Sequence, residues 1–164
     1  MLIPFFVGIF IIAILDQAAK FFAAGLLAKY GSTAPQLVDG VTNIPVIGEY
    51  FKLTYVENTG AGMGILDKYT WLLTVATFVI IIAVVAYVVV KRPKNRVLLT
   101  SLVFLLGGAV GNLVDRIRLE YVRDFLDFGG LYFPYVFNIA DCFITIGAII
   151  FAVYVIFFSD KKEE

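Results

Sequence analysis

Acidic residues carry most of the chemistry that this sequence offers. The chain has no histidine, which excludes Ser-His and Cys-His nucleophile pairs and the zinc sites built on imidazole. Its single cysteine, Cys142, leaves no partner for a disulfide or for a CxxC metal or redox pair. Two carboxyl groups held close together can share one proton, so that one activates water while the other polarises a carbonyl group. We therefore expect any hydrolysis to depend on two aspartates, with no metal or cofactor.

Several aspartates are candidates for such a pair: Asp16, Asp115, Asp124, Asp127 and Asp141. Asp16 and Asp115 have cations nearby, Lys20 four residues on and Arg116 next in sequence, which would keep these acids ionised and suit a structural role. Asp141 has apolar neighbours and Asn138 one helical turn away, so it is the better catalytic candidate. The residues themselves leave the choice between Asp124 and Asp127 open.

The composition places these acids in a membrane protein. Apolar residues make up 61% of the chain and charged residues 16%, and the mean hydropathy is +0.93. Four stretches are long and apolar enough to span a bilayer, at about 2–27, 71–90, 97–116 and 137–158. Helices satisfy their own backbone hydrogen bonds in lipid, so we expect residues 1–164 to form one domain, an all-α membrane protein built as a four-transmembrane-helix bundle. A cleaved signal peptide is the alternative for the first stretch, but that stretch lacks a basic n-region.

The basic residues predict the orientation of the chain. The segment 91–96 reads KRPKNR, and two more lysines follow the last span. By the positive-inside rule, both termini lie in the cytoplasm, and the connections at about 28–69 and 117–136 face outward. Alternation over residues 50–56 predicts a short strand in the first of these, so we expect a small extracytoplasmic cradle that contains β structure. A formal net charge of zero argues against a nucleic-acid partner.

Polar residues of three spans converge on one layer. At the rise of an α-helix, Asp16 lies roughly 22 Å from the inner end of its span, Asn112 and Asp115 roughly 22–27 Å, and Asp141 roughly 26 Å. Charges at such depth cost at least a few kcal/mol each and mark a functional site by default. Below Asn112, Gly107 and Gly111 form a small-xxx-small pair that predicts close approach of another helix.

Five short motifs follow one another along the chain: DQAAK at 16–20, NTGAGMG at 58–64, GNLVDR at 111–116, VRDF at 122–125 and FNIAD at 137–141. In this order they resemble the motifs of lipoprotein signal peptidase, or signal peptidase II, the bacterial aspartic peptidase family A8. The departures are small: Gly62 and Met63 replace an alanine and an aromatic residue, and Arg123 stands where the family often has an apolar residue.

The resemblance implies an endopeptidase of the bacterial cytoplasmic membrane that removes signal peptides from diacylglyceryl-modified prolipoproteins, cutting before the lipidated cysteine. It implies that Asp124 and Asp141 are the catalytic pair, near the extracytoplasmic face. The residues expected to line the site and hold the substrate or the acids are Asn58, Gly60, Asn112, Arg116 and Asn138. Those expected to support the architecture are Asp16, Lys20 and Asp115. The implied partners are the diacylated prolipoprotein, membrane lipid and inhibitory cyclic peptides of the globomycin type.

Two non-enzymatic interpretations compete with this one. In the first, the intramembrane carboxylates relay protons or bind cations, although the polar groups occupy one layer and no polar track continues to the inner face. In the second, the Asp16–Lys20 and Asp115–Arg116 pairs only fix helix packing in a structural subunit. Both predict that Asp124→Asn and Asp141→Asn leave prolipoprotein processing intact.

Overall fold

The computed structural model describes residues 2–30, 43–60, 69–133 and 135–158, and within them the chain forms four long helices. These are α1 (Leu2–Tyr30), α2 (Thr70–Lys91), α3 (Arg96–Leu119) and α4 (Ile139–Phe158). Each is long and apolar enough to cross a membrane, and the four helices lie where the sequence predicts spans. Their ends differ slightly from the predicted ones: α1 and α3 continue further, and α4 begins after Asn138.

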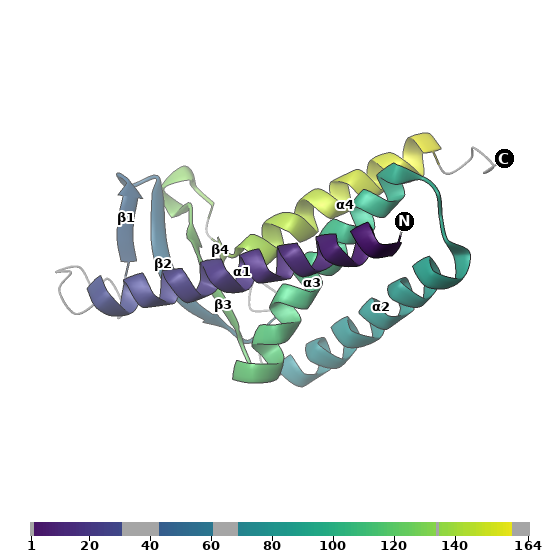
Figure 1. Ribbon diagram of the computed structural model, residues 1–164. Coiled ribbons are helices and arrows are strands. Elements are labelled where there is room, and N and C mark those ends of the chain that lie inside the picture. Colours follow the sequence, from purple (N-terminus) through teal and green to yellow (C-terminus); the bar gives the residue numbers. More distant parts are fainter. Residues whose placement is uncertain (1, 31–42, 61–68, 134, 159–164) are drawn as a thin grey trace.

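Helix α3 is the centre of the bundle, packed against α1, α2 and α4 (Figure 1). Glycines let the neighbouring helices approach it closely. A Cβ atom at Gly107 would lie 2.7 Å from Ile12, and one at Gly111 would lie 2.6 Å from Asp16. Because Ile12 and Asp16 are one turn apart on α1, the small-xxx-small pair forms the α1–α3 contact, as predicted. On another side of α3, Gly108 packs against Ala140 and Ile144 of α4.

A tight connection turns the chain from α2 into α3. Arg92 ends α2 in the left-handed conformation. Asn95 then caps α3, since its side-chain oxygen accepts hydrogen bonds from the backbone N–H groups of Val97 and Leu98. The basic segment 91–96 is therefore a short turn between two apolar helices, and its basic residues are exposed.

A four-stranded antiparallel sheet lies beyond the bundle, in the order β1 (Asn43–Ile47), β2 (Phe51–Asn58), β3 (Val122–Asp127) and β4 (Val136–Phe137), with a 3-10 turn η1 (Gly129–Leu131) before β4. Strand β2 confirms the strand predicted at 50–56. The ring of Phe128 stacks on Phe51 at 4.7 Å and on Phe137 at 5.7 Å, measured between ring centroids. This stack ties the sheet together, and we call the sheet with η1 the cradle.

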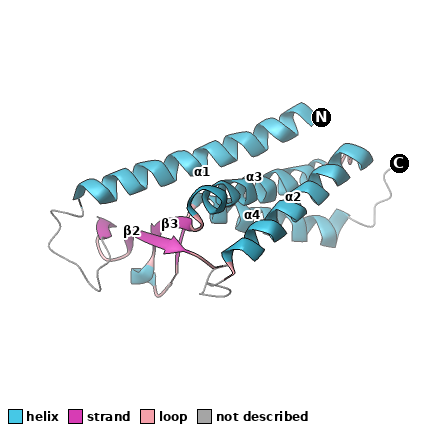
Figure 2. Cartoon of the chain, turned by 90° about the horizontal axis from the view of Figure 1, so that it is seen from below, coloured by secondary structure: helices cyan, strands magenta, loops and turns pink. Residues whose placement is uncertain are grey.

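The cradle occupies one end of the molecule and the basic turn the other (Figure 1). The first residues of α1 and the last residues of α4 also lie at the end with the basic turn. Figure 2 shows the same separation from below, with α1 running along the bundle toward the cradle. Polar residues of α1, α3 and α4 meet where the bundle joins the sheet.

Candidate active site

Asp124 lies in the middle of β3 and is 1% exposed. Val56 on β2 is its pairing partner, and Asn58 pairs with Val122, so Asn58 is the diagonal neighbour of Asp124 on the same face of the sheet. The Asn58 side-chain amide donates a hydrogen bond to Asp124 Oδ2 at 2.8 Å. The antiparallel pairing of β2 with β3 therefore brings two residues far apart in sequence into contact.

Asp141 lies in the first turn of α4, where it forms a reciprocal cap with Asn138. The backbone N–H of Asp141 donates to Asn138 Oδ1 at 3.0 Å, and the backbone N–H of Asn138 donates to Asp141 Oδ2 at 3.2 Å. This is the geometry of a capping box, formed here by Asn and Asp. Asn138 precedes the helix, so the expectation that it lies on the helix itself was wrong.

Asn138 also joins the two acids. While its backbone N–H holds Asp141, its side-chain amide donates to Asp124 Oδ1 at 2.6 Å. On the far side of Asp141, Asn112 donates to Asp141 Oδ1 at 2.8 Å. Each of the four carboxyl oxygens thus accepts one N–H group, and both acids line one cavity of about 380 Å³. The other polar residues that line it are Asn58, Asn112, Arg116, Tyr135 and Thr145.

Arg116 and Gly60 lie beside the acids. Arg116 Nη2 donates to the carbonyl oxygen of Gly60 at 3.1 Å, and the backbone N–H of Gly60 donates to Asn58 Oδ1 at 3.0 Å. Gly60 therefore supports both the arginine and the asparagine that holds Asp124. Among the described residues, Arg116 Nε has no hydrogen-bond partner, which leaves a buried donor beside the cavity. Gly62 and Met63, the departures in the second motif, lie outside the described residues.

The environment of Asp124 favours its protonated form. Burial raises the pKa of Asp124 to about 6; the hydrogen bond from Asn58 opposes the rise and the charge of Asp141 adds to it. A carboxyl group that keeps its proton in mild acid therefore shares a cavity with a second carboxyl group at a helix N-terminus. Such a pair can divide the tasks of proton donor and proton acceptor.

Asp127, the alternative to Asp124, does not line this cavity. Its carboxyl group accepts hydrogen bonds from the Thr54 hydroxyl at 2.7 Å and from the backbone N–H of Gly129 at 2.8 Å. Because side chains alternate along a strand, residues three apart point to opposite faces. If residues 122–127 had been predicted as a strand, Asp124 and Asp127 would have been expected on opposite faces of a sheet. The sequence pattern there predicted only a connection between two spans.

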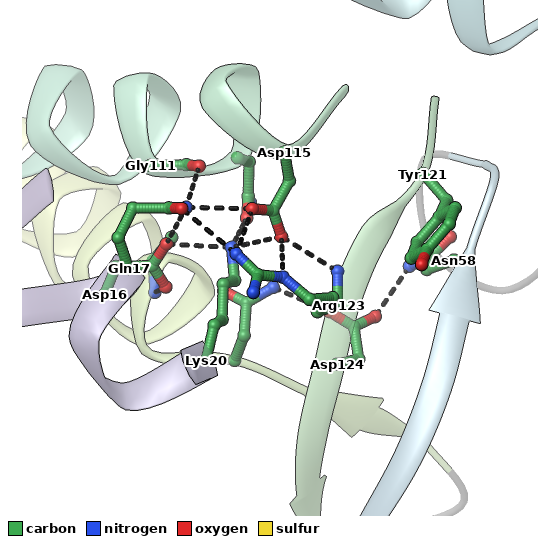
Figure 3. A network of polar contacts seen from close by, with 12 residues as sticks. Asp16, Gln17, Lys20, Asn58, Gly111, Asp115, Tyr121, Arg123 and Asp124 are labelled. Carbon is green, nitrogen blue, oxygen red and sulfur yellow. Dashed lines mark hydrogen bonds and ion pairs between the residues drawn. The ribbon is translucent and has the colours of Figure 1, made fainter. Parts of the chain in front are cut away.

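A second polar cluster lies next to the acids, where α1 meets α3 (Figure 3). Lys20 Nζ is 2.8 Å from Asp16 Oδ2 and 3.4 Å from Asp115 Oδ2. The Asp16–Lys20 pair is thus confirmed. The Asp115–Arg116 pair was wrong: Asp115 contacts Arg123 at 2.7 Å and accepts from Gln17 at 2.9 Å. Successive residues of a helix point in different directions, which sends Arg116 to the cavity and Asp115 to the cluster.

Gln17 and Arg123 were missing from the predicted site residues. Arg123 donates to Gln17 Oε1 at 3.0 Å as well as to Asp115, so the cluster joins β3 to α1 and α3. One feature of the sequence indicated Arg123: a charged residue stands where the family often has an apolar one. That cation lies one residue from Asp124, yet its side chain contacts the cluster instead.

The chain as a whole is similar to known proteins of one family. A family model described as Signal peptidase (SPase) II matches residues 8–157. The lipoprotein signal peptidase of Caldanaerobacter subterraneus subsp. tengcongensis is 44% identical over 146 residues, 89% of this chain and 91% of the relative. That of Clostridium acetobutylicum is 35% identical over 152 residues, 92% of each chain. A bacterial membrane enzyme solved by the in meso method at 2.3 Å resolution superposes with a TM-score of 0.77 at 28% identity, covering 98% of this chain and 93% of that one.

Proposed function

Because the chain belongs to the signal peptidase II family, we propose that Asp124 and Asp141 are the catalytic pair that cuts signal peptides from diacylglyceryl-modified prolipoproteins. The chain is an aspartic peptidase and a multi-pass bacterial membrane protein. Family membership also sets aside the interpretations as a proton carrier or a purely structural subunit. The proposal concerns which two aspartates transfer protons, in which order they do so, and on which side of the membrane they lie.

In the proposed mechanism, Asp141 is the base and Asp124 the acid. Asp141 takes a proton from a water molecule, whose oxygen attacks the carbonyl carbon before the lipidated cysteine. Asp124 gives its proton to the carbonyl oxygen, which yields a neutral gem-diol. As the C–N bond breaks, Asp141 passes its proton to the leaving amine and Asp124 recovers one from the diol. Each acid ends in the state in which it began.

The observation that carries this assignment is the shared environment of the two acids. Asn138 contacts both, and each carboxyl oxygen accepts an N–H group within one cavity. Asp141 lies at the N-terminus of α4, where the helix dipole favours a carboxylate. The raised pKa of Asp124, about 6, suits it to hold the proton. Arg116 and its unused donor are suited to bind a backbone carbonyl of the substrate.

We further propose that the cavity lies near the extracytoplasmic face. The basic turn 91–96 marks the cytoplasmic end by the positive-inside rule, and the cradle is at the other end (Figure 1). A helical signal peptide can then present its end to the acids while the diacylglyceryl chains remain in lipid. Cyclic peptides of the globomycin type would inhibit by occupying the same cavity.

The test is cleavage of a diacylated prolipoprotein peptide by purified variants. We expect Asp124→Asn and Asp141→Asn each to lower kcat by at least about 10³-fold, because each removes one proton-transfer step, without loss of folding. Asp127→Asn is the matched control, since Asp127 lies on the same strand and outside the cavity. Cleavage retained in either the Asp124 or the Asp141 variant would overturn the assignment.

A further inference from the structure

The side-chain amide of Asn112 connects Lys20 to Asp141, one of the proposed catalytic pair. Lys20 Nζ donates to Asn112 Oδ1 at 2.8 Å, and Asn112 Nδ2 donates to Asp141 Oδ1 at 2.8 Å. An ammonium group can only donate hydrogen bonds, and an ionised carboxylate can only accept them. Asn112, between the two, therefore has one orientation that satisfies both neighbours, with its oxygen toward Lys20 and its NH₂ toward Asp141.

Lys20 is itself held in place. It is 1% exposed, and its charge is compensated by Asp16 and Asp115. Asp16 in turn accepts a hydrogen bond at 2.8 Å from the backbone N–H of Ala140, the residue before Asp141. A buried ammonium of this kind is costly to displace, because losing any partner leaves charge unpaired in a medium of low dielectric.

We infer that Lys20 is a positioning residue of the peptidase: it fixes the Asn112 amide so that the NH₂ group, and not the carbonyl oxygen, faces Asp141. This inference rests on the proposed function, in which Asp141 takes the proton from water. Without the lysine, the Asn112 oxygen loses its donor, and the amide is held only through its NH₂ group. The amide can then shift, and it takes the donor of Asp141 out of place.

The predicted effect is on turnover. A misplacement of about 1 Å can cost about 10²-fold in rate, so we expect Lys20→Met to lower kcat by about 10- to 100-fold, with KM changed by less than about threefold. Lys20→Met leaves Asp16 without its cation, whereas Asp115 keeps Arg123, so a Lys20→Met/Asp16→Asn double variant removes that charge imbalance. It still lacks the donor to Asn112, and we expect the same loss of kcat from it.

A double-mutant cycle separates positioning from simple stabilisation. If Lys20 acts through Asn112, adding Lys20→Met to Asn112→Ala lowers kcat no further than Asn112→Ala does alone. A lysine that merely stabilises the fold would give losses that multiply. Val88→Ala is the matched control: Val88 is fully buried in the apolar core of the bundle and does not line the cavity, so its truncation tests loss of stability alone. It should lower the unfolding temperature and change kcat by less than about twofold.

The experiment also separates this inference from the proposed function. Asp141→Asn is measured beside the other variants with the same lipidated peptide. Activity retained in Asp141→Asn would overturn the proposed function. An inactive Asp141→Asn together with full kcat in Lys20→Met/Asp16→Asn, or multiplying losses in the cycle, would overturn the role of Lys20 alone.

Discussion

At the scale of single residues, the buried aspartates of the site fall into two groups according to the side chains that contact them. Asp16 and Asp115 form ion pairs with cations, both with Lys20 and Asp115 also with Arg123. Asp124 and Asp141 instead accept hydrogen bonds from the neutral amides of three asparagines, Asn58, Asn112 and Asn138. An amide orients a carboxyl group without fixing its charge. The acids proposed to exchange protons are therefore the ones held by amides.

The hydrogen bond from Asn58 makes this distinction testable by pH. Asn58 stabilises the ionised form of Asp124, whose pKa is about 6, so Asn58→Ala should raise that pKa. A hydrogen bond to a charged group is worth about 1.5 kcal/mol, which corresponds to about one pH unit. Because activity requires the proton on Asp124, we expect the basic limb of kcat/KM to move upward by about one unit.

Thr54→Val is the control for this profile. It removes a comparable hydrogen bond from the same strand to Asp127, outside the cavity, so the basic limb should stay where it is. A basic limb that does not move in Asn58→Ala, or moves to lower pH, would contradict the assignment of the proton to Asp124.

At the scale of elements, close helix packing sets the position of the acids. The close approach at Gly108 brings α3 against Ala140, and Asp141 is the next residue of α4. A methyl group at Gly108 would meet the backbone carbonyl oxygen of Ala140, which cannot rotate away as a side chain can. The α3–α4 contact therefore fixes the distance of Asp141 from Asn112.

Gly108→Ala should lower both stability and activity. Overpacking of this kind costs about 1–3 kcal/mol, so we expect a lower unfolding temperature in detergent and a loss of cleavage as α4 shifts. Gly25→Ala is the control, because nothing lies within 4 Å of its Cβ position on α1, and alanine is the better helix former. Equal stability of the two variants would show that the α3–α4 contact tolerates a methyl group.

The elements also differ in how far the sequence predicts them. The spans, the Asp16–Lys20 pair and the layer that holds Asn112 and Asp141 follow from apolar length and helical rise, which are local properties. Strand β3 does not, because it is short and is stabilised by pairing with β2, more than sixty residues away in the chain. Asp124 lies on that strand, so only the motif resemblance singled it out. The contact of Arg123 with Asp115 likewise depends on where β3 lies beside α3.

At the scale of the whole molecule, the basic turn and the candidate active site lie at opposite ends. The cavity adjoins the cradle, whereas the basic turn lies at the far end of the bundle (Figure 1). The apolar core of Phe5, Val88, Leu98, Leu102 and Leu106 lies between them. This arrangement is suited to a substrate whose cleavage site meets water at one face while its lipid stays in the bilayer.

The proposed orientation predicts which end reacts with a membrane-impermeant thiol reagent. In a Cys142→Ala background the sequence has no other cysteine, so a single introduced thiol reports its own side. Tyr132 of the cradle is 98% exposed, and Tyr132→Cys should be labelled nearly completely in intact spheroplasts. Lys91→Cys, at the exposed end of α2, should be labelled only after permeabilisation, and it leaves the other cations of the turn in place. Labelling of Lys91→Cys in intact spheroplasts, with Tyr132→Cys protected, would reverse the orientation and put the acids at the cytoplasmic face.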